Sequence, residues 1–105
     1  ALLIKVSGET SMVYPKKKSG FALDELQKFV GGMVEMVPLP NCRELVGNET
    51  GKLDGLPKNE LATKLWKTVY PIEKYPNNND ELIVGDVLIV GRKIEELVKL
   101  IELKK

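Results

Sequence analysis

Two carboxylates interrupt otherwise apolar stretches of the chain and are the first candidates for chemistry. Glu35 lies inside MVEMVPL at 33–39, and Asp86 lies inside ELIVGDVLIVG at 81–91. If the two side chains converge, they could carry out acid–base catalysis or hold a divalent ion. Glu35 by itself could accept hydrogen bonds from the amine, guanidine or base edge of a ligand. The structural alternative is that Glu35 faces water and that a bulge turns Asp86 outward.

A second set of candidates lies where helices are expected to begin or end. Asn59 and Thr63 are one turn apart at the start of a helix predicted at 60–69, and could present an amide and a hydroxyl to an anion. Alternatively, Asn59 caps that helix and Thr63 is exposed. Gly31 and Gly32 could bring backbone amides close to a phosphate, or could simply close a helix with a tight turn. The chain has neither a G-x-G-x-x-G run nor a Lys-Ser phosphate loop.

The composition argues against several classes of function. Without histidine, the chain lacks the commonest metal ligand and the commonest general base, so we expect no metal, no cofactor and no enzymatic activity. Cys42 is the single cysteine, which predicts a reducing, cytoplasmic environment. A net charge of +1 disfavours a dedicated nucleic-acid binder. The apolar runs fall short of the roughly 20 residues of a membrane span, so no membrane association is expected.

These residues must be positioned by strands and helices that the apolar spacing predicts. Strands are expected at 2–6, 11–15, 33–39, 43–47 and 81–91, and helices at 60–69, at 92–105 and from Ala22 to a glycine at 31 or 32. The segment 81–91 is almost uniformly apolar, which indicates a central strand covered on both faces, with Gly85 at a bulge or a close backbone approach. This order predicts an α+β fold: a mostly antiparallel sheet of about five strands, packed with two helices, plus a C-terminal helix.

The domain organisation expected from length is a single α+β domain over 1–91, with an amphipathic helix over 92–105 appended to it. That helix carries an apolar stripe, which either covers an open face of the sheet or pairs with a second copy of the chain. A homo-oligomer is therefore left open. The candidate self-association residues are Ile94, Leu97, Val98, Leu100 and Ile101.

Three segments of the chain, taken in order, resemble a known family. They are LQKFVGGMVEMVPL, GNETGKLDGLPKNELAT and IVGDVLIVG, and with their spacers they cover roughly residues 11 to 91. Together they resemble the domain of unknown function 3846, found in small proteins of bacteriophages, mobile elements and some large DNA viruses, and as a module in bacterial proteins. The helix at 92–105 lies outside the resembling part. The resemblance implies a genomic setting more than a chemistry.

The function expected from these observations is a small, non-enzymatic intracellular binding protein. It would be a viral or mobile-element accessory factor that binds a host component or a small nucleotide-like ligand in the host cytoplasm. One alternative is a structural or assembly protein, possibly a virion component, that oligomerises through the C-terminal helix. Another is a DNA-directed antirestriction or regulatory factor, which would need a basic face that the composition does not show.

Overall fold

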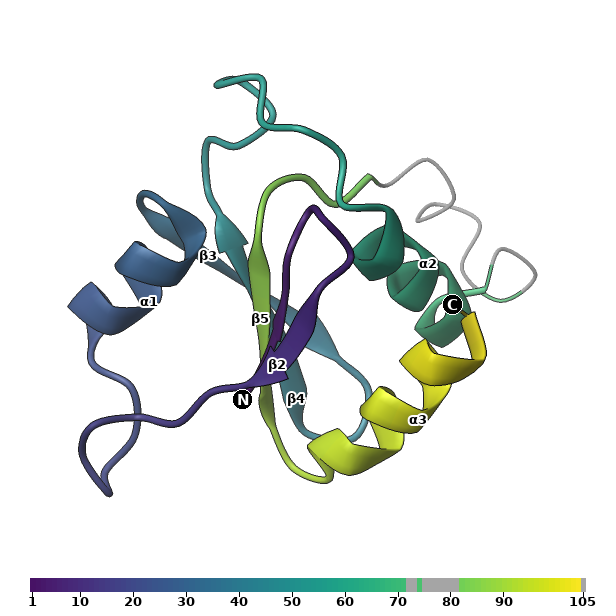
Figure 1. Cartoon of the computed structure of the whole chain (residues 1–105), viewed down its shortest axis with the longest axis horizontal. Coiled ribbons are helices and arrows are strands. Elements are labelled where there is room, and N and C mark those ends of the chain that lie inside the picture. Colours follow the sequence, from purple (N-terminus) through teal and green to yellow (C-terminus); the bar gives the residue numbers. More distant parts are fainter. Residues whose placement is uncertain (72–73, 75–81, 105) are drawn as a thin grey trace.

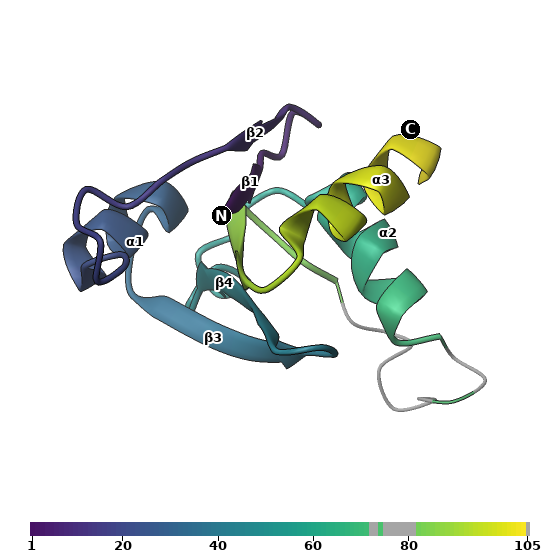
Figure 2. The same cartoon turned by 90° about the horizontal axis from the view of Figure 1, so that it is seen from below.

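The computed structural model describes residues 1–71, 74 and 82–104. Five strands form one antiparallel sheet in the order β2-β1-β5-β4-β3. Helix α1 covers one face of this sheet, and α2 and α3 cover the other (Figures 1 and 2). The predicted α+β architecture is therefore confirmed. The elements are β1 (Leu2–Ile4), β2 (Thr10–Met12), α1 (Leu23–Val30), β3 (Val34–Leu39), β4 (Arg43–Asn48), α2 (Glu60–Val69), β5 (Val87–Gly91) and α3 (Ile94–Lys104).

The central strand β5 pairs with β1 on one side and β4 on the other, and both of its faces are buried. Val87 and Ile89 pack into the core beneath α2 and α3, whereas Leu88 packs on the side of α1. The predicted strand at 81–91 is nevertheless too long, because β5 begins only at Val87. Gly85 has a φ of +74°, which interrupts the extended backbone, and residues 82–86 form only one isolated β-bridge, between Val84 and Lys58, which belongs to no strand. Residue 81 lies outside the described residues.

Polar contacts shorten the first hairpin relative to the prediction. β1 ends at Ile4 rather than at residue 6, and β2 covers Thr10–Met12 rather than 11–15. The amide of Val6 donates to the Asp86 carboxylate at 2.9 Å instead of to a neighbouring strand, and the amide of Lys5 donates to the Glu9 carbonyl within the turn. The contact with Asp86 is therefore one reason why the pairing of β1 with its neighbouring strands ends at Ile4.

Helix α3 is part of the main core. Ile94, Leu97 and Ile101 are 6%, 1% and 1% exposed and belong to the same cluster as α2 and the sheet. Val98 and Leu100 are partly buried against that cluster. The stripe therefore covers a face of the sheet, which was the first of the two expected arrangements. Within the described part of the chain, no helix combines the length and apolar character needed to cross a membrane.

Candidate functional site

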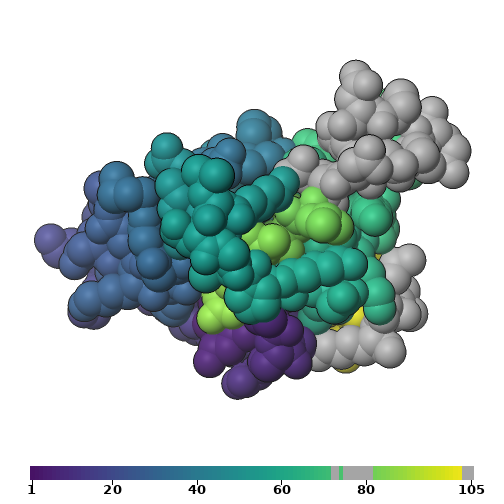
Figure 3. Space-filling view, turned by 90° about the horizontal axis from the view of Figure 1, so that it is seen from above, coloured from purple at the N-terminus to yellow at the C-terminus, as the bar shows by residue number. Residues whose placement is uncertain are grey.

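A pocket opens at one end of the sheet, where β3 starts, β4 ends and the chain enters β5. Figure 3 looks onto this end, where the light-green segment that leads into β5 lies between the teal atoms that follow β4 and those of α2. The cavity measures about 270 Å³. Because Trp66 of α2 lines it, we call it the Trp66 pocket. Its other buried or partly buried apolar lining residues are Val37, Leu45, Ile83, Val84 and Val87.

Trp66, which lines this pocket, carries an unused hydrogen-bond donor. The residue is 7% exposed, and its indole Nε1 is buried without a hydrogen-bond partner in the described structure. The ring packs against Tyr70 with centroids 4.8 Å apart, and the Tyr70 hydroxyl donates to the Pro38 carbonyl at 2.7 Å. An indole N–H can only donate, and leaving it unpaired in a buried position costs roughly 1–3 kcal/mol. Trp66 belongs to the main core cluster, and nothing in the sequence indicated that its N–H would stay unpaired.

Glu35 lines the same pocket from β3. Its side chain is on the face of the sheet that carries Val37, which packs against the core under α2. The residue is exposed, and its neighbour across the strand pair is Gly47, which has no side chain to fill the space beside it. Glu49 and Lys52 also line the pocket, so its polar wall contains two carboxylates and an ammonium group.

Asp86 does not join Glu35. Its carboxylate accepts the hydrogen bond from Val6 described above, and Asp86 is not among the residues that line the Trp66 pocket. The structure therefore does not assemble the carboxylate pair on which acid–base or metal chemistry would depend. Among the residues that the structure describes, no cluster of three or more histidine, cysteine or carboxylate side chains is placed to hold a metal ion.

Asn59 and Thr63 direct their polar atoms at their own chain. Asn59 is fully buried: its Oδ1 accepts from the Ala62 amide at 3.0 Å, and its Nδ2 donates to the carbonyls of Ile4 and Gly85. Asn59 is therefore the predicted N-cap of α2, and it also ties that helix to β1 and to the segment before β5. The expected anion-binding amide is thus already used within the fold.

Thr63 is 3% exposed, so the alternative expectation that it faces solvent is wrong. Its hydroxyl accepts from the Ile83 amide at 3.0 Å and lies 3.4 Å from the Ile83 carbonyl, to which it donates. Thr63 therefore holds the segment that forms one wall of the Trp66 pocket. Its hydroxyl is therefore used to position Ile83 and is not directed at a ligand.

Gly31 and Gly32 close α1. Gly31 has a φ of +78°, and the amides of both glycines donate to the Gln27 carbonyl. A Cβ on Gly32 would lie 2.9 Å from the side-chain amide of Asn48, so this glycine makes room for a residue that lines the Trp66 pocket. The C-cap alternative explains both residues, and neither lines the pocket.

Leu53, in the loop after β4, and Leu82, before β5, form an apolar rim to the pocket. Leu53 is 89% exposed and Leu82 is 41% exposed, and both line the opening. The loop is held by the Thr50 hydroxyl, which donates to Asp54 at 2.7 Å, and by the Thr50 amide, which donates to Asn48 at 2.9 Å. Of the two leucines in LDGLP, Leu56 lies against Gly85, whereas Leu53 is exposed at the rim.

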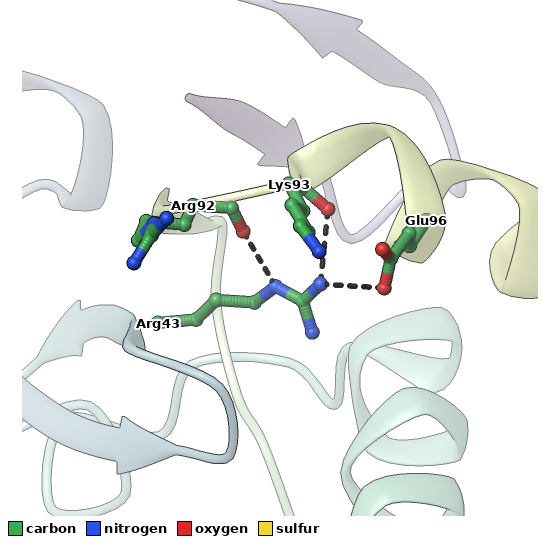
Figure 4. Close-up of polar contacts among 4 residues, drawn as sticks. All are labelled: Arg43, Arg92, Lys93 and Glu96. Atoms are coloured by element: carbon green, nitrogen blue, oxygen red, sulfur yellow. Dashed lines mark hydrogen bonds and ion pairs between the residues drawn. The ribbon is translucent and has the colours of Figure 1, made fainter.

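Arg43 is a buried polar residue that sequence reasoning missed. It is 6% exposed, and its guanidinium donates to the carbonyls of Arg92 and Lys93 and to the Glu96 carboxylate, at 2.7, 3.0 and 3.1 Å (Figure 4). These contacts attach β4 to the start of α3.

A polar hollow of about 360 Å³ lies beside them and is lined in part by Cys42. No buried, unpaired side-chain group of the described residues points to a ligand there, so we assign the candidate site to the Trp66 pocket.

Comparison with known proteins identifies the family but no characterised relative. The family model for the domain of unknown function DUF3846 matches residues 2–104. This match includes α3, so the expectation that the C-terminal helix lies outside the family pattern is wrong. Neither the curated proteins nor the solved structures that were compared contain a match. The chain belongs to the DUF3846 family, a domain of unknown function.

Proposed function

We propose that this protein is a small, non-enzymatic binding protein whose ligand occupies the Trp66 pocket. The observation that carries the proposal is the buried Nε1–H of Trp66, which has no partner in the described structure and lies on a residue that lines a cavity. A ligand that accepts this hydrogen bond would remove the cost of leaving the donor unpaired. The biological role we propose is an accessory factor of a virus or mobile element that captures a host component or nucleotide-like molecule in the cytoplasm.

The origin of the lining residues supports this choice of site. The three segments that resemble the family contribute most of the described lining residues, including Glu35, Asn48 and Val84. These segments are separate in the sequence, yet residues from all three line the same pocket. A volume of about 270 Å³ is just below the roughly 300 Å³ at which ligand pockets usually begin, which suits one ring system rather than a large cofactor.

Binding is proposed rather than catalysis because the pocket offers recognition groups without an assembled reaction centre. Asp86 is hydrogen-bonded to Val6, and Thr63 is hydrogen-bonded to Ile83. The structure does not favour assembly through the C-terminal helix, because Leu97 and Ile101 of its apolar stripe are each 1% exposed and are buried in the core of the same chain. A DNA-directed role has no supporting charge excess in the sequence.

The test uses the single tryptophan of the chain as a reporter. Cyclic nucleotides, nucleotide sugars and nucleosides are screened by Trp66 fluorescence and thermal shift, and hits are measured by calorimetry. Replacing Trp66 with phenylalanine keeps an aromatic ring and removes the N–H, so affinity should fall by about two- to tenfold, as expected for one hydrogen bond of roughly 0.5–1.5 kcal/mol. Binding no tighter than millimolar across the panel, or equal binding by Trp66→Phe, would refute the proposal.

A further inference from the structure

We propose that the Trp66 pocket recognises a heteroaromatic base that carries an exocyclic amino group, of the adenine or cytosine type, and excludes phosphate from the vicinity of Glu35. This inference rests on the proposed function and specifies its ligand. It follows from three properties of the pocket: the kinds of hydrogen-bonding groups, the apolar walls and the balance of charge.

The hydrogen-bonding groups are complementary to a particular kind of molecular edge. The Trp66 indole N–H can only donate, and the Glu35 carboxylate can only accept. A ligand that satisfies both must present an acceptor and a donor. Adenine presents an exocyclic amino group beside a ring nitrogen, and cytosine presents an amino donor together with ring acceptors. A guanidinium or an aliphatic ammonium has donors only, so it would leave the indole N–H unpaired.

The walls favour a ring over a polar chain. Leu45 and Val87 line the pocket from the sheet, Val84 lines it from the segment before β5, and Leu53 and Leu82 extend the apolar surface to the opening. An aliphatic wall lined in this way stabilises a flat, weakly hydrated ring by removing apolar surface from water. The cavity of about 270 Å³ accommodates one base but leaves most of an attached sugar outside.

The charges that line the pocket argue against a phosphate inside it. Glu35 and Glu49 contribute two carboxylates, and Lys52 contributes the one ammonium group among the described lining residues. Charge complementarity at a binding site determines which partners are rejected as well as which are attracted. A nucleobase or nucleoside should therefore bind better than the corresponding monophosphate, provided that the base enters the pocket first.

The experiment compares matched ligands on the full chain by calorimetry. Adenosine is compared with purine riboside, which lacks only the amino group, and with adenosine 5′-monophosphate; cytidine is compared with uridine. We expect adenosine or cytidine to bind at least tenfold more tightly than its partner without the amino group, and adenosine to bind more tightly than its monophosphate. The Glu35→Ala variant removes the acceptor and should lose most of this amino-group preference.

Glu44→Ala is the matched control, because Glu44 is an exposed glutamate on the neighbouring strand β4 and does not line the pocket. It should bind as the wild type does, and thermal unfolding of both variants checks that they fold. If the bases bind in a Trp66-dependent way without preference for the amino group, or if the monophosphate binds more tightly, the inference is overturned while the proposed function stands. If no base binds but a nucleotide sugar or cyclic nucleotide does, the inference again fails alone. If nothing in either panel binds, both fail.

Discussion

Replacing Asn59 with alanine should destabilise the fold strongly, and this distinguishes a structural residue from a ligand-binding one. Asn59 is 0% exposed and makes three side-chain hydrogen bonds that join α2, β1 and the segment before β5. If it were a ligand group, its removal would weaken binding and leave stability nearly unchanged. If the structural role is correct, its removal disconnects one wall of the Trp66 pocket from the helix beneath it.

The expected loss can be worked out from these contacts. Removing the N-cap costs about 1 kcal/mol. Each of the two hydrogen bonds donated by Nδ2, to Ile4 and Gly85 at 3.0 and 2.9 Å, contributes about 1 kcal/mol net, and more if its carbonyl stays buried without a partner. The sum is about 3–5 kcal/mol, a large part of the roughly 5–15 kcal/mol that stabilises a domain of this kind.

Urea unfolding, followed by Trp66 fluorescence and far-ultraviolet circular dichroism, measures this loss. Glu60→Ala is the matched control, because Glu60 is exposed at the next helix position and its ion pair with Lys58 is largely solvated. It should change the free energy of unfolding by no more than about 0.5 kcal/mol. A loss below about 1 kcal/mol for Asn59→Ala would show that the three hydrogen bonds do not stabilise the fold as argued.

Three further substitutions test the supports around the two ends of the sheet, each by the same unfolding measurement. Thr63→Val keeps the side-chain shape but removes the acceptor of a buried amide, so it should cost about 1–3 kcal/mol, and a neutral result would contradict the assignment. Arg43→Met should cost about 2–3 kcal/mol, and because two of its three bonds go to carbonyls, high salt should not abolish the loss. Gly91→Ala should lower the free energy of unfolding by at least about 2 kcal/mol, because the φ of Gly91 is +129° and an added Cβ would overlap the Cys42 backbone. Gly8→Ala is the control and should lower it less, because Gly8 has a φ of +91° but open space around it.

Much of the fold was predictable because it depends on local patterns. Helical spacing and a following glycine predicted α1 and a C-cap at Gly31 or Gly32, of which Gly31 is the cap, and Asn59 was predicted as the N-cap of α2. The uniform apolar character of the last strand correctly indicated a central position. These features rely on the periods of 3.6 and 2 residues and on backbone preferences of single residues, and all of these can be read along the chain.

The errors arise where distant segments decide the outcome. An apolar run buried by tertiary contacts has the same hydropathy whether it is a strand or an irregular segment, so the break at Gly85 was only partly visible. That segment is fixed by Asn59, which is 26 residues away from Gly85. Arg43 resembles an ordinary surface arginine in RELVG, and its carbonyl partners are 49 and 50 residues further along the chain.

The sequence by itself determined the class of fold, Asn59 as the N-cap of α2 and the face of β3 on which Glu35 lies, because alternation and capping act over a few residues. Only the tertiary structure decided which candidates stay available for a ligand. Folding used the polar groups of Asn59, Thr63 and Asp86 for internal hydrogen bonds. It left the N–H of Trp66 unpaired on a residue that lines a cavity, and that depends on how the sheet, α2 and the loop after β4 pack together.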